Sequence, residues 1–86
     1  MILFHRQGWL DYLDWQRNDH RSLDRLNRLI EECRRTPFEG TGRPEPLRGN
    51  WSGFWSRRID EQHRLIYRFT NGTLEIAQCR YHYDDP

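Results

Sequence analysis

Asn71-Gly72 separates two short, largely apolar segments, and this pair constrains the fold more than any other feature of the sequence. Both positions of a two-residue hairpin turn need a positive φ, which Asn and Gly adopt at little cost. If these residues form the turn, the strand register follows by counting outward. The facing pairs on one side are then Phe69 with Leu74, Tyr67 with Ile76 and Leu65 with Gln78. This register gathers apolar residues on one face and predicts an antiparallel hairpin.

The last third of the chain predicts three strands, over residues 54–59, 63–70 and 73–82. The face away from the apolar side then carries Arg64, Ile66, Arg68, Glu75, Ala77, Cys79, Tyr81 and Tyr83. Arg68 lies opposite Glu75 in this register, which predicts a surface ion pair. We expect this second face to stay open to solvent.

Residues 1–36 predict a short strand followed by two helices. Residues 1–5 form an apolar run that suits a strand, and residues 7–17 show the spacing of an amphipathic helix. Asp19 is the expected N-cap of a second helix that ends near Thr36, because Pro37 disfavours helical geometry in the residue before it. The apolar stripe of that helix is Leu23, Leu26, Leu29, Ile30 and Cys33. We expect an antiparallel helical hairpin that covers the apolar face of the sheet, which is an α+β fold.

Residues 37–53 are punctuated by Gly and Pro and predict a long ordered loop. Loops of this length inside a compact domain are more often functional than connective. The carboxylate of Glu45, which lies between Pro44 and Pro46, is therefore a candidate for chemistry. Its ordinary interpretation is a solvated loop residue.

Composition narrows the class of protein. The chain has 86 residues, enough for one small domain over residues 1–86, and its 14 basic and 13 acidic side chains leave a formal net charge of +1. Every basic residue is Arg, whose planar guanidinium grips phosphate with two parallel hydrogen bonds. The sequence has neither a signal-peptide pattern nor the roughly 20 consecutive apolar residues of a membrane span, so we expect a soluble cytoplasmic protein. Cys33 and Cys79 are expected to fill the core.

Sequence patterns of metal sites, phosphate-binding loops and serine hydrolases are absent, so we expect no metal and no cofactor. What remains is the carboxylate of Glu45, guanidinium groups at Arg58 and Arg64, and the imidazole of His82. These side-chain types suffice to cleave RNA. A base removes the 2'-OH proton, an arginine neutralises charge on the phosphate, and an acid protonates the departing 5'-oxygen. Nearby tyrosines can stack on splayed single-stranded bases.

Each candidate also has an ordinary interpretation. Arg58 and Arg64 are strand arginines of the kind that solvate an outer sheet face, and His82 is close enough to the C-terminus to be simply exposed. The same arginines and tyrosines would suit a non-catalytic module that binds RNA, or that completes a repressor complex with a partner. The residues by themselves leave the catalytic and the binding hypotheses open.

Several segments, taken in order, resemble the YoeB/Txe toxins of the RelE superfamily. They are Thr36-Pro37-Phe38-Glu39-Gly40, Pro44-Glu45-Pro46-Leu47, Ser52–Ile59, His63–Tyr67 and Cys79–Tyr83. The likeness covers essentially the whole chain and includes Trp9, Tyr12 and Trp15 in the first predicted helix.

The resemblance implies a RelE-like fold and the toxin of a type II toxin-antitoxin pair. Such a toxin is an endoribonuclease that enters the ribosomal A site, cuts the bound mRNA and inhibits translation, and the expected products are a 2',3'-cyclic phosphate and a 5'-hydroxyl. The resemblance also implies a cognate YefM-like antitoxin, whose disordered C-terminal segment wraps the toxin. Operator DNA would be bound only as a complex with the antitoxin, and the toxin would frequently be a homodimer.

Carried over position by position, the resemblance assigns Glu45 as general base, His82 as general acid and Arg64 as the residue that stabilises the transition state. Tyr83 would join this catalytic group by supporting the scissile phosphate. The residues that would bind substrate are Arg48, Arg58 and Tyr81.

The sequence departs from the family pattern at three places. These are Arg48, where many relatives carry Lys, His5 in place of an aromatic residue, and the tail Asp84-Asp85-Pro86. Strict alternation along the last strand also puts His82 on the covered face of the sheet. We therefore predict a break in regular pairing between Arg80 and Tyr83.

Overall fold

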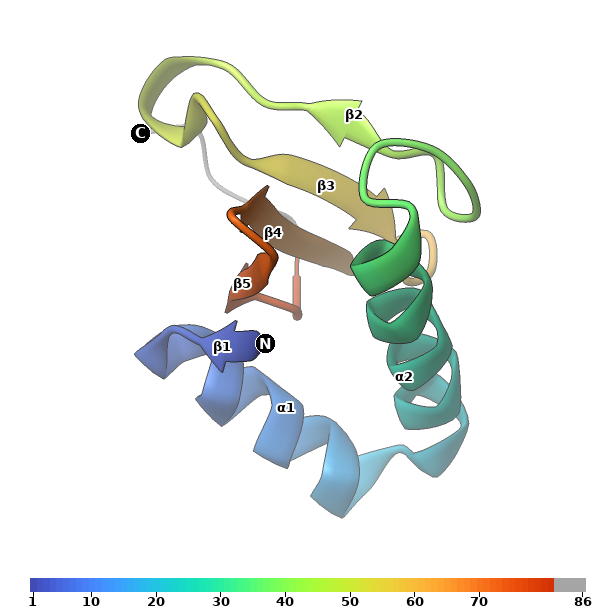
Figure 1. Cartoon of the computed structure of the whole chain (residues 1–86). Coiled ribbons are helices and arrows are strands. Elements are labelled where there is room, and N and C mark those ends of the chain that lie inside the picture. The colour runs from blue at the N-terminus through green and yellow to red at the C-terminus, as the bar shows by residue number, and fades with distance from the viewer. Residues whose placement is uncertain (82–86) are drawn as a thin grey trace.

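The computed structural model describes residues 1–81, which form two helices and a five-stranded sheet (Figure 1). In chain order the elements are β1 (Ile2–Phe4), α1 (Arg6–Asn18), α2 (His20–Arg35), β2 (Glu45–Pro46), the 3-10 helix η1 (Gly49–Trp51), β3 (Trp55–Arg58), β4 (Arg64–Thr70) and β5 (Thr73–Gln78). The α+β class, the N-terminal strand and the two consecutive helices are confirmed. No helix within residues 1–81 is long and apolar enough to cross a membrane.

The strands lie in the order β1-β5-β4-β3-β2. Pairing is antiparallel from β2 to β5, which the sequence predicts for β3, β4 and β5 but not for β2, and β1 lies parallel to β5, so the sheet is mixed. β1 is tied into the sheet by backbone bonds from the Leu74 amide to the Met1 carbonyl and from the His5 amide to the Ile76 carbonyl, both 2.9 Å. The chain therefore begins beside the strand that carries its C-terminal segment.

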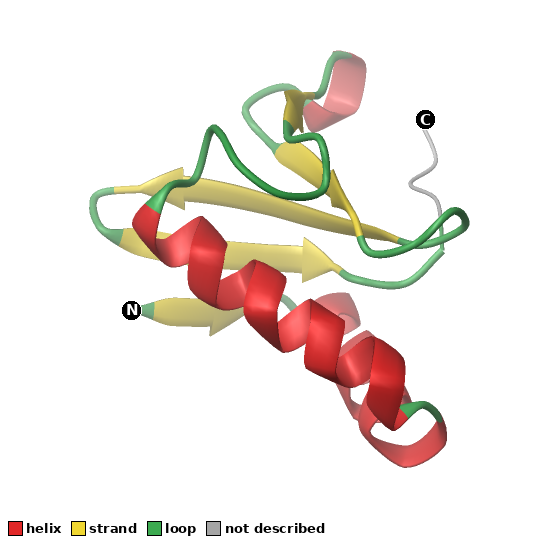
Figure 2. Cartoon of the chain, turned by 90° about the vertical axis from the view of Figure 1, so that its right-hand side faces the viewer, coloured by secondary structure: helices red, strands yellow, loops and turns green. Residues whose placement is uncertain are grey.

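The second helix begins and ends where local chemistry requires. Asp19 caps α2 by accepting a 3.1 Å hydrogen bond from the Ser22 amide, and α2 stops at Arg35, before the residue that precedes Pro37. The arms of the predicted hairpin open into a V, and α2 lies across one face of the sheet (Figures 1 and 2). Its apolar stripe thus faces the strands rather than α1 alone.

The main core lies between the helices and this face of the sheet. Its buried residues are Trp15, Leu26, Leu29, Ile30, Cys33, Ile59, Leu65, Tyr67, Leu74, Ile76 and Cys79. Both cysteines are free and buried, as expected, and burial raises the pKa of the Cys33 thiol to about 11. Burying each Leu or Ile side chain here contributes roughly 1.5–3 kcal/mol.

The hairpin turn is confirmed, since Asn71 and Gly72 have φ values of 50° and 76°. The register is correct as far as Tyr67 opposite Ile76, and then a β-bulge shifts it, so that Ile66 rather than Leu65 faces Gln78. The predicted Leu65–Gln78 pair is therefore wrong. An extra residue in one strand reverses the alternation beyond it. This reversal explains why Cys79, predicted on the outer face, lies in the main core.

The outer face of the sheet is less open than predicted. A second apolar cluster covers part of it, with Leu47, Ile66 and Ala77 buried and Trp51 and Phe54 packed against them. Leu47 and Trp51 of this cluster come from the segment 37–53, which the sequence predicted as a loop. That segment includes β2 and η1, so it is not wholly irregular.

Candidate functional site

Glu45 lies in β2, at the edge of the sheet, rather than in the predicted loop. Its Cα pairs with that of Ser56 in β3, and Ser56 pairs in turn with Ile66 in β4. Facing residues in neighbouring strands project from the same face of a sheet. Ile66 belongs to the outer cluster, so the exposed Glu45 side chain also projects from the outer face.

Arg58 and Arg64 occupy the next row on that same face. They pair with each other across β3 and β4, two residues along from Ser56 and Ile66. Residues two apart in a strand share a face, and neighbouring strands lie about 4.8 Å apart. The register therefore places one carboxylate and two guanidinium groups, all predicted from the sequence, on one face near one end of the sheet.

The surroundings of these two arginines differ. Arg58 is exposed, whereas Arg64 is only 9% exposed, so the ordinary interpretation of Arg64 as a solvating surface residue is wrong. Its Nη1 donates hydrogen bonds to the carbonyl oxygens of Asp60 at 2.8 Å, His63 at 3.1 Å and Glu61 at 3.3 Å. The β3–β4 connection thus holds the Arg64 guanidinium in place and orders it before any substrate arrives.

Of the remaining predicted residues, the structure describes Arg48 and Tyr81. Arg48 is exposed at the N-terminus of η1. Tyr81 is 52% exposed, and its φ of 61° shows that the chain turns sharply there. Regular pairing ends at Gln78, earlier than the predicted break between Arg80 and Tyr83. His82 and Tyr83 lie outside the described residues, so their predicted convergence with Glu45 and Arg64 stays a prediction.

A buried arginine that the sequence analysis did not single out anchors the segment leading to Glu45. Arg57 is fully buried; its Nη2 donates to the carbonyls of Thr36 and, at 2.8 Å, Glu39, and its Nη1 donates to that of Thr41 at 3.2 Å. Its Nε donates to the Tyr67 hydroxyl at 3.1 Å. Three carbonyls of one segment on one guanidinium fix the path of the chain before β2. Alternation along β3, with Arg58 outward, was the signal that could have indicated Arg57 facing inward.

The C-terminal segment is anchored by α1, which the sequence analysis also did not predict. Asp11 Oδ2 accepts the Cys79 amide hydrogen at 3.0 Å, and Trp15 Nε1 donates to the Cys79 carbonyl at 2.7 Å. Gly8 permits this approach, since a Cβ there would lie 2.5 Å from the Ile76 carbonyl oxygen. The spacing of Asp11 and Trp15, one helical turn apart, was the available signal.

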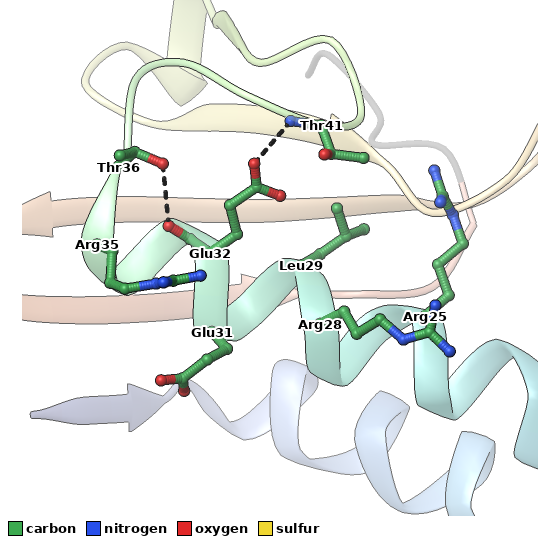
Figure 3. Close-up of a pocket in the computed structure, with 8 residues that line it drawn as sticks. All are labelled: Arg25, Arg28, Leu29, Glu31, Glu32, Arg35, Thr36 and Thr41. Atoms are coloured by element: carbon green, nitrogen blue, oxygen red, sulfur yellow. Dashed lines mark hydrogen bonds between the residues drawn. The ribbon is translucent and has the colours of Figure 1, made fainter.

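A cavity of about 650 Å³ lies elsewhere, between α2 and the segment that follows it (Figure 3). Its lining residues are Arg25, Arg28, Leu29, Glu31, Glu32, Arg35, Thr36 and Thr41. The Thr41 amide donates a 3.0 Å hydrogen bond to Glu32 Oε1, and this bond is the main cause that lowers the pKa of the Glu32 carboxyl. None of the predicted site residues that the structure describes lines this cavity.

Residues 1–81 contain no group of three or more His, Cys, Asp or Glu side chains placed to hold a metal ion. The chemistry available on the described outer face is that of a carboxylate beside two permanently charged guanidinium groups. Such a set can bind a phosphodiester and accept a proton.

Comparison with known proteins gives the same family as the sequence motifs. Residues 4–83 match the model of the YoeB-like toxin of bacterial type II toxin-antitoxin systems. Toxin YoeB of Escherichia coli strain K12 is 56% identical over 82 residues, which are 95% of this chain and 98% of that protein.

Solved structures agree in fold as well as in sequence. The YoeB/ParE toxin from Agrobacterium tumefaciens has a TM-score of 0.91 at 48% identity, covering 95% of this chain and 98% of that one. The toxin in the heterotetrameric YoeB–YefM complex of Staphylococcus aureus has a TM-score of 0.89 at 39% identity, covering 96% and 97% of the two chains. The YoeB dimer of Staphylococcus aureus has a TM-score of 0.88 at 40% identity, covering 95% of each chain. The chain therefore belongs to the YoeB-like toxins of bacterial type II toxin-antitoxin systems.

Proposed function

We propose that this toxin is a metal-independent endoribonuclease that cleaves mRNA on the ribosome and thereby inhibits translation. The observation that carries the proposal is the register that puts Glu45, Arg58 and Arg64 on one face of the sheet, in a chain of the YoeB-like family. A carboxylate beside paired arginines supplies a proton acceptor next to a phosphate-binding group.

The proposed reaction uses the ribose itself as the nucleophile. Glu45 accepts the proton of the 2'-OH, and the 2'-oxygen attacks the adjacent phosphorus. Arg64 neutralises the charge that develops on the phosphate, with Arg58 and Arg48 holding neighbouring phosphates. The bond to the 5'-oxygen breaks as His82 gives it a proton, which leaves a 2',3'-cyclic phosphate and a 5'-hydroxyl.

The burial of Arg64 supports its proposed role. Its guanidinium is already ordered by the carbonyls of Asp60 and His63, so binding a phosphate requires little further loss of side-chain freedom. Tyr81, exposed at the end of the described chain, offers an aromatic face on which an unpaired base can stack. Tyr83 completes the proposed catalytic group by supporting the scissile phosphate.

The proposed partners follow from the relatives. We infer that a YefM-like antitoxin binds this toxin and holds it inactive in the cytoplasm, since a YoeB of Staphylococcus aureus is solved as a complex with YefM. The YoeB dimer from the same organism supports a homodimer of this chain. The proposed substrate is mRNA in the ribosomal A site, and operator DNA would be bound only together with the antitoxin.

Mapping of mRNA 5' ends in cells that express single variants tests the proposal. Glu45→Gln, Arg64→Ala and His82→Gln should each abolish cleavage that the wild type produces. Glu31→Gln is the matched control, because Glu31 is an exposed carboxylate on α2 that pairs with Arg34, and this variant should cleave like the wild type. Growth arrest that persists without cleavage in all three site variants would instead favour the non-catalytic binding module.

A further inference from the structure

The end of the described chain is fastened at several successive points. Both backbone polar groups of Cys79 are bound by α1, through Asp11 and Trp15. The Arg80 guanidinium forms an ion pair with Asp14 of the same helix. Residues 79–80 are therefore held to α1, and Tyr81 is the next residue along the chain.

Tyr81 adopts a left-handed backbone conformation, with a φ of 61°. A non-glycine residue is disfavoured in this region because its Cβ crowds the backbone, so surrounding contacts must hold it there. Two hydrogen bonds do so: the Tyr81 amide donates to His63 Nδ1 at 2.6 Å, and the Tyr81 carbonyl accepts from the Arg64 amide at 3.1 Å.

The first of these bonds fixes the chemical state of His63. A backbone amide can only donate, so Nδ1 must carry a lone pair, and the neutral ring then has its hydrogen on Nε2. The imidazole packs edge-on against the Trp15 ring, with centroids 4.8 Å apart, and its centroid lies 5.2 Å from that of the Tyr81 ring. Its orientation is therefore set by packing as well as by the hydrogen bond.

We propose that His63 is a positioning residue: its neutral imidazole holds Tyr81, which immediately precedes the proposed general acid His82 in the sequence, in the left-handed turn. Protonation of Nδ1 would place one N–H group against another and release Tyr81. The part of this inference that concerns catalysis rests on the proposed function, which assigns the general acid to His82. The His63–Tyr81 hydrogen bond and its loss on protonation, which we call the hydrogen-bond switch, do not depend on any activity.

Charged groups from each neighbouring element lie near the His63 imidazole. From α1 and the C-terminal segment come Asp14 and Arg80, an ion pair whose guanidinium lies 4.7 Å from the Tyr81 ring centroid. From the β3–β4 connection, Asp60 Oδ1 accepts the His63 amide hydrogen at 2.6 Å, and from β4 Arg64 Nη1 donates to the His63 carbonyl at 3.1 Å. Two carboxylates and two guanidinium groups thus lie around this hydrogen bond.

Nuclear magnetic resonance of the full chain tests the switch directly. The Tyr81 amide proton of the wild type should shift in step with titration of the His63 ring. In His63→Asn the Asn Oδ1 can accept a hydrogen bond from the Tyr81 amide and does not titrate. The pH-dependent change in the chemical shift of the Tyr81 amide proton should therefore disappear. At low pH this proton should keep the chemical shift of the hydrogen-bonded state. In His63→Leu the amide should exchange with solvent about tenfold faster, the scale expected for one lost hydrogen bond.

Two results would overturn the inference. One is a Tyr81 amide that does not respond to titration of the His63 ring in the wild type. The other is a His63→Asn variant that shows the same pH step as the wild type. The Asn variant keeps a polar acceptor of smaller size, so the test does not depend on whether the Leu variant folds.

Cleavage of ribosome-bound mRNA tests the consequence for catalysis. Once acidification protonates the His63 ring, the wild type should lose kcat about tenfold, with KM unchanged, and His63→Asn should lack this acid limb. An acid limb that is identical in the two proteins would contradict the positioning role. If neither the wild type nor His63→Asn cleaves RNA at any pH, the proposed function fails. The NMR titration of the Tyr81 amide then still tests the role of His63.

Discussion

Two segments of the molecule lead to proposed site residues, and they are anchored by different chemistry. Residues 36–41, before Glu45, are fastened by the buried guanidinium of Arg57, whose donors bind three backbone carbonyls. Residues 79–81, before His82, are fastened by the carboxylate of Asp11, the ion pair of Asp14 and the imidazole of His63.

This difference matters because the two kinds of anchor respond differently to protons. A guanidinium keeps its charge at any pH that a folded protein meets, whereas carboxylates and imidazoles titrate. The three Arg57 contacts of residues 36–41 therefore do not depend on pH, although the Glu32 carboxylate that accepts from the Thr41 amide can be protonated. The anchors of residues 79–81 include more groups that can change their protonation state.

Replacement of Arg57 should have the largest effect on stability. Arg57→Met leaves the three carbonyls and the Tyr67 hydroxyl without their donor, and breaking such a buried network costs about 3–5 kcal/mol. Urea unfolding measures this loss. Arg58→Met is the matched control, because its side chain is exposed on the same strand, and it should change the free energy of unfolding by about 0.5 kcal/mol or less. Equal losses in the two variants would contradict the anchoring role of Arg57.

Replacement of Asp11 should cost less, because it removes a single acceptor. Asp11→Ala leaves the buried Cys79 amide unpaired, which costs about 1–3 kcal/mol, whereas Asp11→Asn retains an acceptor oxygen and should recover part of that loss. Thermal unfolding compares the two variants, with Asp24→Ala on the exposed side of α2 as the control. If Asp11→Ala were as stable as Asp24→Ala, the Cys79 amide would not depend on α1.

The Arg68–Glu75 pair on the outer face should give the smallest, pH-dependent effect. Arg68 donates to Glu75 at 3.0 and 2.9 Å, and these bonds, with a further one from His5, lower the pKa of Glu75 from 4.5 to about 2. Since folding depresses this pKa, the pair stabilises fully above about pH 5, and its contribution is lost as the pH falls toward 2.

The free energy of unfolding of Glu75→Gln, measured from pH 7 to pH 3, checks this sign. The wild type should be more stable at pH 7, and the two proteins should converge on acidification. Glu39→Gln, on an exposed carboxylate, should show no such convergence. A difference between wild type and Glu75→Gln that does not vary with pH would rule out the pair as its source.

Local chemistry is what made most of the fold predictable. Asn71-Gly72, Asp19 and Pro37 each act on their own neighbours, and the turn, the N-cap and the end of α2 all lie where these residues require. The Arg68–Glu75 pair followed from the turn by counting, and the structure confirms it. Patterns of this kind need no knowledge of distant contacts.

The errors came from interactions between distant segments. The β-bulge between β4 and β5 brings Cys79 into contact with α1. The alternation of residues 73–82 does not predict this bulge. Glu45 pairs with Ser56 of β3 at the edge of the sheet, although the prolines on either side of Glu45 predicted a loop. Arg64 is an exception, because the carbonyls that hold its guanidinium belong to the connection immediately before it, and strand alternation does not show them. The identity of the candidate residues could be predicted, but their burial and anchoring could not.

A double-variant cycle on cleavage of ribosome-bound mRNA tests the central claim most directly, namely that Glu45 and Arg64 act from one sheet face on one phosphodiester. The proteins compared are wild type, Glu45→Gln, Arg64→Lys and the double variant, each first shown to be folded. We expect each single variant to lose about 100-fold or more in kcat, and the double variant to lose little beyond the larger single loss. Cleavage at the wild-type rate in either single variant, or losses that simply multiply, would contradict the account.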